Sequence, residues 1–179
     1  MFTMAVVQMD KEMNVNLLNS LLSRLDRLAK KSLALLVVSV AIESLALAML
    51  VVYAAKYVLK INLDDVPPLT GWWLIAVAVV IAPVFETLIF QATAMWATTK
   101  WDLTGWVKWA TFVVPFACAH MQNSFVRGIA AGVIGGVYLG ACYMVSRGHG
   151  SWRFAFSVTT IAHALHNLLA IVLSSIFAL

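Results

Sequence analysis

The chain has 179 residues, of which 63% are hydrophobic and only 11% are charged, with a formal net charge of +4. An average soluble domain is about half apolar and about a quarter charged, so this chain cannot cover its surface with groups that water solvates. The composition excludes a soluble enzyme and a disordered tail, and the length fits one domain. Because the basic residues lie beside apolar runs, the expected partner is the lipid bilayer and no nucleic acid.

The first predicted element is an amphipathic helix over residues 13–31. Leucines recur along it at helical spacing with basic residues between them: Leu17, Leu18, Leu21, Leu22, Leu25 and Leu28, and Arg24, Arg27, Lys30 and Lys31. This pattern is typical of a helix packed on the membrane face, and a dedicated lipid- or partner-binding helix is the alternative. Residues 1–31 are predicted to form an N-terminal cytoplasmic segment and not a cleaved signal peptide, because the first apolar run starts too late and is too long.

Five apolar segments follow, at residues 32–56, 71–98, 107–126, 128–146 and 154–178. A hydrocarbon core about 30 Å thick needs about 20 residues of helix, and backbone groups in lipid must bond within their own segment. The sequence therefore predicts an all-α polytopic membrane helix bundle of about five transmembrane helices over residues 32–179. Turns are expected at 60–68, 100–106 and 147–153. The remaining separator is only Arg127-Gly128, which predicts a tight hairpin or one bent unit.

Lysine and arginine residues accumulate on the cytoplasmic side of membrane proteins. With the N-terminus inside, the cytoplasmic stretches hold nine of them, and the opposite side holds three, Lys56, Lys60 and Arg127. The nine are Lys11, Arg24, Arg27, Lys30, Lys31, Lys100, Lys108, Arg147 and Arg153. We therefore expect a multi-pass protein of a prokaryotic cell (inner) membrane, with its N-terminus in the cytoplasm and its C-terminus on the far side.

The fourth apolar segment carries a glycine at every fourth position: Gly128, Gly132, Gly136 and Gly140. On a helix these positions form one smooth stripe that lets another backbone approach closely. The stripe is expected either to pack inside the bundle or to form the interface of a homo-oligomer. Neither interpretation makes these glycines catalytic.

The polar side chains that are expensive to place in lipid include Glu43, Glu86, His120, His163, His166 and Asn167, which lie within the apolar segments. A charge at the centre of a bilayer costs several kcal/mol, so a buried ionisable group is a functional candidate. His163 and Asn167 are four residues apart and therefore share a helix face. A single intramembrane histidine is often only a hydrogen-bonding residue between helices, but polar groups near mid-depth on three segments favour a shared site.

Three motifs, in this order, resemble those of the CAAX protease and bacteriocin-processing family of intramembrane proteases: Glu86, Phe116-x-x-x-His120 and His163-x-x-x-Asn167. The resemblance covers roughly residues 80–170. It implies a helical membrane protease in which Glu86 is the glutamate that activates water. The substrates of the family include prenylated C-terminal motifs and bacteriocin-type peptides.

Two positions depart from the family pattern, which has adjacent glutamates followed by an arginine, Glu-Glu-x-x-x-Arg. Thr87 stands in place of the second glutamate and Gln91 in place of the arginine. Loss of the arginine removes a cation that would hold a carboxylate ionised. Glu43 is expected either to substitute for the missing carboxylate or to be a hydrogen-bonded structural residue. His166 lies outside the motif, and we expect it to support the site or to pack.

Peptide hydrolysis needs a base for water and donors for the oxyanion. Glu86 and His120 are expected to orient and deprotonate a water molecule as a coupled pair. His163 and Asn167 are expected to donate hydrogen bonds to the oxyanion. The predicted function is therefore an intramembrane endopeptidase that acts on a membrane-associated peptide or protein, with no cofactor.

Two alternative functions remain open. The substituted positions Thr87 and Gln91 favour a catalytically silent relative that acts as a scaffold, an immunity factor or a partner-binding membrane protein. Glutamate and histidine side chains also suit zinc, which leaves a metal-binding membrane protein. The sequence contains no His-Glu-x-x-His spacing.

Overall fold

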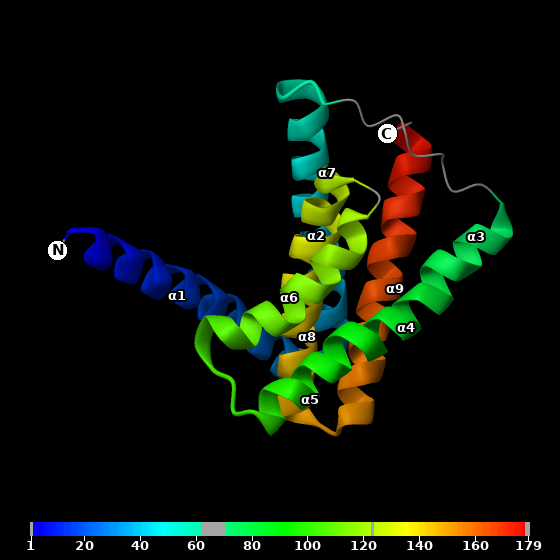
Figure 1. The fold of residues 1–179 in the computed structure, drawn as a ribbon. Helices are drawn as coiled ribbons and strands as arrows, with labels where there is room; N and C mark the ends of the chain where they lie inside the picture. The colour runs from blue at the N-terminus through cyan, green and yellow to red at the C-terminus, as the bar shows by residue number, and fades with distance from the viewer. Residues whose placement is uncertain (1, 62–70, 123, 178–179) are drawn as a thin grey trace.

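The computed structural model describes residues 2–61, 71–122 and 124–177, and the regular elements in these ranges are all helical. Helix α1 (Phe2–Lys31) comes first, and five continuous helical stretches follow it (Figure 1). Several of these stretches contain π-helical segments, labelled η. The first stretch consists of α2 (Leu33–Tyr53) and η1 (Ala54–Val58). The second consists of α3 (Trp72–Ala76), η2 (Val77–Ile81), α4 (Ala82–Glu86), η3 (Thr87–Ala92) and α5 (Thr93–Lys100). The third is α6 (Gly105–Met121), the fourth consists of α7 (Phe125–Arg127), η4 (Gly128–Ile134) and α8 (Gly135–His149), and the fifth is α9 (Trp152–Phe177).

The all-α polytopic bundle is confirmed, with four helices of spanning length and apolarity among the described residues. These are Leu33–Val58, Val77–Lys100, Phe125–His149 and Trp152–Ser175. The fifth predicted segment, 107–126, is helix α6, which has 17 residues. At 1.5 Å per residue α6 extends about 26 Å, which is shorter than a hydrocarbon core of about 30 Å.

The turn that the sequence placed at Arg127-Gly128 lies elsewhere, so that boundary was wrong. Helix α6 ends at Met121, and the next helix begins after Ser124, whose hydroxyl accepts a hydrogen bond from the backbone N–H of Arg127 at 3.1 Å. Gly128 lies inside the helix, and a Cβ there would be only 2.1 Å from Cγ of Met121. It allows a close contact and forms no turn. The predicted turn at 60–68 falls almost entirely outside the described residues.

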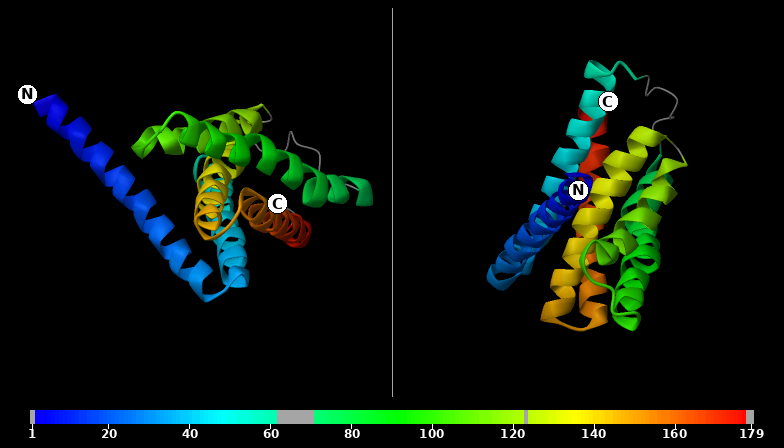
Figure 2. Two further views of the ribbon diagram at one scale, coloured as in Figure 1. Left: turned by 90° about the horizontal axis from the view of Figure 1, so that it is seen from below. Right: turned by 60° about the vertical axis from the view of Figure 1, so that its left-hand side comes forward.

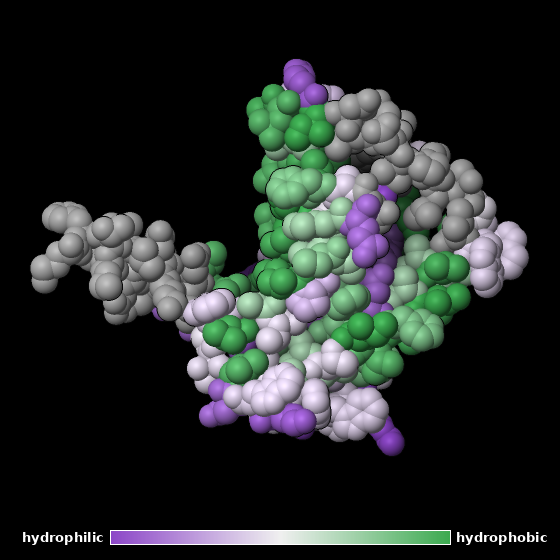
Figure 3. Space-filling model, viewed as in Figure 1, coloured by the Kyte–Doolittle hydropathy of each residue, from purple (hydrophilic) through white to green (hydrophobic). Residues whose placement is uncertain are grey.

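Helices α2, α8 and α9 run side by side, and the stretch from α3 to α5 crosses them at an angle (Figures 1 and 2). The junction of α1 with α2, the end of α5 and the turn between α8 and α9 lie toward one end of the bundle, and the C-terminus lies at the other. The face shown in Figure 3 is largely apolar, with hydrophilic side chains at the lower end and along a narrow central band. A surface of this kind suits lipid as the surrounding solvent.

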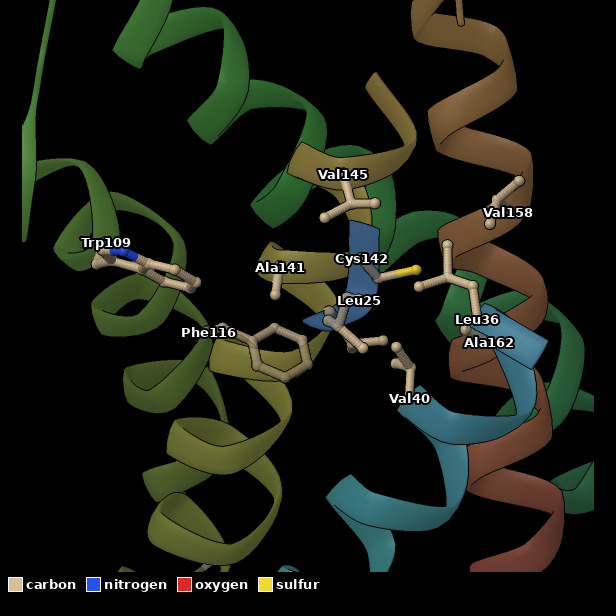
Figure 4. Close-up of a cluster of buried hydrophobic side chains, with 11 residues drawn as sticks. Leu25, Leu36, Val40, Trp109, Phe116, Ala141, Cys142, Val145, Val158 and Ala162 are labelled. Carbon is tan, nitrogen blue, oxygen red and sulfur yellow. The ribbon is translucent and has the colours of Figure 1, made fainter. Parts of the chain in front are cut away.

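The buried core joins residues from four of these stretches and from α1 (Figure 4). Leu36 and Val40 of α2 and Phe116 of α6 are 0–1% exposed. Leu25 of α1 is also fully buried in this cluster. The second half of α1 therefore packs into the bundle, which explains the recurrence of leucine at helical spacing.

A charged contact fixes α1 to the bundle. The guanidinium group of Arg24 donates hydrogen bonds to both carboxylate oxygens of Glu43 in the middle of α2, and the hydroxyl of Tyr138 donates to the same carboxylate at 3.3 Å. The hydrogen bond to Glu43 raises the pKa of Arg24 above its ordinary value. Glu43 is thus a hydrogen-bonded structural residue, which is the second of the two interpretations given above.

We expect Arg24→Gln to destabilise the protein, because it leaves the partly buried carboxylate of Glu43 without its cation. Breaking a fully buried pair costs about 3–5 kcal/mol, but these side chains are 40% and 29% exposed, so we expect about 1–2 kcal/mol. The thermal unfolding midpoint in detergent measures this effect. Arg27→Gln is the matched control, because Arg27 donates to the exposed Ser23 one turn earlier in the same helix. Equal midpoints for the two variants would contradict the assignment.

The glycine stripe of η4 and α8 packs against α6 of the same chain. A Cβ at Gly132 would lie 2.6 Å from Cα of Ala117, and one at Gly136 would lie 3.1 Å from Cα of Val113. Such distances require direct contact between helix backbones. The structure thus shows the stripe packed within the bundle, and formation of a homo-oligomer stays a prediction.

Candidate active site

Three predicted site residues meet around one carboxylate oxygen. Nε2 of His163 lies 3.6 Å from Oε2 of Glu86, and Nε2 of His120 lies 3.9 Å from the same oxygen. Glu86 comes from the end of α4, His120 from the last turn of α6 and His163 from the middle of α9. Both distances exceed a direct hydrogen bond and are too short for a molecule to lie between the atoms, so a molecule that bonds both sides would have to lie beside the line that joins them.

The backbone around Glu86 is unusual. The five residues of α4 lie between two π-helical segments, η2 and η3. Pro83 in this stretch cannot donate a helical hydrogen bond, which accords with the widened helix before it. Wide π turns in helices often occur at functional sites. They also change which side chains share a face, so the orientation of Glu86 does not follow from a regular helical repeat.

The backbone of α6 fixes the tautomer of His120. Nδ1 of His120 lies 2.9 Å from the carbonyl oxygen of Phe116, one turn earlier in the same helix. A carbonyl oxygen can only accept, so Nδ1 carries a proton, and in the neutral ring Nε2 presents a lone pair toward Glu86. The ring of Phe116 lies 4.5 Å from the ring of His120 and 5.9 Å from that of His163, measured between centroids. The Phe-x-x-x-His spacing thus places an apolar spacer against both imidazoles.

Asn167 lies one turn after His163 on α9. Its side-chain nitrogen donates to the carbonyl oxygen of Ala78 at 2.8 Å, which ties α9 to η2, the segment before Glu86. A side-chain amide carries two N–H donors, and this bond uses one of them. His163, one turn earlier on the same helix, is buried, with 4% of its surface exposed. Sequence reasoning did not foresee the contact with Ala78, because a backbone acceptor gives no signal in the residue type.

Beside Glu86, which is not one of its lining residues, lies a cavity of about 30 Å³. Its lining includes Ser44, His120, His163, His166 and Asn167. A polar cavity of this size has room for a water molecule. A second cavity, of about 330 Å³, is lined, among the described residues, by side chains of α2 and η1, and none of the predicted site residues is one of them.

His166 and Glu43 have separate places. Nδ1 of His166 lies 2.7 Å from the hydroxyl oxygen of Ser44 on α2, so this imidazole belongs to the cavity wall. Glu43 is bonded to Arg24, as described above, and is not brought to Glu86. Sequence reasoning missed Ser44, although a serine beside Glu43 in an apolar segment was a usable signal.

Thr87 and Gln91, the two positions that depart from the family pattern, are fully buried. Oγ1 of Thr87 and both amide atoms of Gln91 have no hydrogen-bond partner within the part of the chain that the structure describes. The charged residues of the family pattern are thus replaced here by two neutral side chains. No charge is left unpaired at either position.

In the described ranges, no group of three or more His, Cys, Asp or Glu side chains is arranged to hold a metal ion. Glu86, His120 and His163 come nearest to such a set, because their side chains converge on one point. They bring a carboxylate and two imidazoles together.

The family model for Rce1-like proteins, described as type II CAAX prenyl endopeptidase Rce1-like, matches residues 68–169. This match covers more than half of the chain and includes all four predicted site residues. Neither a curated protein nor a solved structure matches the chain.

Proposed function

We propose, since the chain belongs to the Rce1-like family of type II CAAX prenyl endopeptidases, that it is an intramembrane endopeptidase in which Glu86 activates water. The observation that carries the proposal is the convergence of His120 and His163 on one oxygen of Glu86 beside a water-sized cavity. The carboxylate and Nε2 of His120 are both acceptors. A water molecule, with two O–H donors, complements them.

In the proposed reaction, the water oxygen attacks the carbonyl carbon of the scissile peptide bond while Glu86 takes one of its protons. His163 and Asn167 donate hydrogen bonds to the oxyanion of the tetrahedral intermediate. The carbon–nitrogen bond then breaks, and the proton passes from Glu86 to the leaving amine. The carboxylate of Glu86 is thereby regenerated, and the products are a carboxylic acid, which keeps the second hydrogen of the water, and an amine.

The proposed substrate is a membrane-associated peptide or protein, and the experiment identifies it directly. Membrane fractions from cells that express the wild-type chain or Glu86→Gln are compared by peptidomics. We expect precursor peptides to accumulate with the variant, and the wild-type protein to cleave the synthetic precursor in liposomes. A farnesylated peptide with a C-a-a-X ending is included as a probe. Identical peptidomes, with no cleavage of any probe, would overturn the proposal.

The liposome assay also tests the metal-dependent alternative. Under the proposed mechanism, Glu86 and His120 activate water themselves, so chelators leave the rate unchanged. A rate that chelators abolish and zinc restores would overturn this mechanism and favour metal-assisted hydrolysis.

The substitutions at Thr87 and Gln91 favour the silent alternative, and their burial provides a test. We expect Thr87→Glu alone to lower stability by about 3 kcal/mol, because it places an unpaired carboxylate in a fully buried position. The double variant Thr87→Glu/Gln91→Arg adds an opposite charge within the same buried segment and is expected to recover part of this loss. Thermal unfolding measures both, and Thr93→Glu, on the exposed side of the same helix, is the control.

Activity of the same variants separates the two functions. If Thr87 and Gln91 form a neutral replacement of an ion pair, the wild type is active and the double variant retains activity. An inactive wild type that gains activity only in the double variant would instead show that the chain is a silent member of the family.

For the orientation we propose a cytoplasmic N-terminus, with the C-terminus on the far side. The basic residues at the ends of α1, α5 and α8 support it, because these ends lie on the same side of the bundle (Figure 1). A reporter fused after Leu179 that is active only outside the cytoplasm is expected to give a signal. A signal from a cytoplasm-specific reporter would reverse the orientation of the C-terminus.

A further inference from the structure

An exposed cluster of aromatic and basic side chains lies where α5 ends. Nζ of Lys100 lies 4.6 Å from the ring centroid of Trp96 and 5.8 Å from that of Trp101. The two indole rings are 5.8 Å apart, measured between centroids. Both tryptophans are more than half exposed, at 57% and 58%. We call these three residues the α5-end cluster.

Every polar side-chain group of the α5-end cluster is a hydrogen-bond donor. The ammonium group of Lys100 has three N–H donors and each indole has one, and neither type of side chain has an acceptor. Within the described residues, Lys100 forms no ion pair, and neither indole N–H has an acceptor. Asp102 is exposed in the turn that follows, and it is not paired with Lys100 either. A set of donors without acceptors is complementary to an anion that is rich in oxygen atoms.

The α5-end cluster belongs at the surface of the membrane. Lys100 is the last residue of the spanning helix Val77–Lys100, and tryptophan side chains prefer the lipid–water interface. The turn between α8 and α9 lies at the same end of the bundle (Figure 1), and there the guanidinium group of Arg153 lies 5.6 Å from the ring of Trp152. Figure 3 shows hydrophilic side chains at this end. Phosphate oxygens of lipid headgroups are the abundant anionic acceptors at this level.

We propose that the α5-end cluster binds the phosphate group of an anionic phospholipid, with the Lys100 ammonium and the two indole N–H groups as donors. Hydrogen bonds between an ammonium group and a phosphate are stronger than those between neutral groups. The faces of aromatic rings also attract quaternary ammonium groups such as choline. Here the Lys100 cation already lies near both rings and repels a second cation, so an anionic lipid is favoured over phosphatidylcholine. This binding does not depend on the proposed hydrolysis.

Native mass spectrometry of the full chain, released from detergent micelles, measures the affinity for added phosphatidylglycerol. We expect Lys100→Gln to weaken binding of the first lipid about fivefold, since a cation near a membrane surface contributes about 1 kcal/mol. Lys100→Arg keeps the charge and should bind within about twofold of the wild type. Lys56→Gln is the matched control, because Lys56 lies 5.7 Å from the ring of Tyr57 at the opposite end of the bundle (Figure 1). An equal loss in the two glutamine variants, or no loss in Lys100→Gln, overturns the proposal.

Brominated lipids show where the lipid binds, because bromine quenches tryptophan fluorescence only at close range. In nanodiscs we expect brominated phosphatidylglycerol to quench more than the same content of brominated phosphatidylcholine. The difference should disappear in Trp96→Phe/Trp101→Phe, which changes only exposed side chains. A difference that persists in this variant would place the lipid elsewhere and overturn the proposal. Inorganic phosphate at the concentration of the brominated lipid should have no effect, and loss of the difference on its addition would assign the α5-end cluster to free phosphate instead.

Discussion

Glu86→Gln is expected to lower kcat/KM by about 1,000-fold while the protein still inserts and folds. The amide keeps the shape of the side chain but cannot take a proton from water, and a general base contributes about 100- to 10,000-fold. A factor of 1,000 corresponds to about 4 kcal/mol of barrier height. Cleavage of the identified precursor in liposomes measures the loss, and thermal unfolding in detergent verifies the fold.

Glu43→Gln is the matched control for this variant. It makes the same chemical change in the second glutamate that lies within an apolar segment, at a position bonded to Arg24. We expect lower stability and, per folded molecule, a rate within about threefold of the wild type. If Glu43→Gln abolished cleavage and Glu86→Gln did not, the catalytic carboxylate would have been assigned to the wrong helix.

Gly132→Leu is expected to prevent folding. Even the first side-chain atom at this position would lie 2.6 Å from Cα of Ala117 and 3.2 Å from Cβ of His120. Ala117 meets the stripe with its backbone, which cannot rotate away as a flexible side chain can. The smaller change Gly132→Ala should therefore still cost about 1–3 kcal/mol. Folded yield and the unfolding midpoint in detergent measure both variants.

Gly148→Ala shows what the same substitution does without a close neighbour. A Cβ at Gly148 meets no atom within 4 Å, and alanine favours helix over glycine by up to about 1 kcal/mol. We expect this control to be neutral or slightly stabilising. If Gly132→Ala were as harmless as Gly148→Ala, the contact between α6 and the stripe would not be formed in the membrane.

The sequence predicted the parts of the site that follow from the regular repeat of an α-helix. Phe116 and His120, and likewise His163 and Asn167, are four residues apart, so each pair had to share a face of its helix. The free energy needed to place an ionisable group in lipid then identified Glu86 as a candidate. The structure brings Glu86, His120 and His163 together, and Asn167 lines one cavity with the two histidines.

Contacts between distant parts of the chain were not predictable in this way. Glu43 finds its cation on α1, a helix that reads as a surface element, and Ser44 meets His166 from 122 positions away. Gly128 next to Arg127 looks like a turn, but the close approach of Met121 is what requires a glycine there. The π-helical segments around Glu86 break the repeat of 3.6 residues, so helical spacing cannot give the faces of that stretch.

The short helix α6 has a consequence for the lipid around the protein. Its length of about 26 Å falls some ångströms short of an average hydrocarbon core, and a bilayer adapts to such hydrophobic mismatch by thinning beside the helix. Because His120 is the next-to-last residue of α6, the thinned flank lies next to the candidate site. Lipids with shorter acyl chains would match this flank without distortion. The thickness of the host membrane therefore sets the depth of the site below the lipid–water interface.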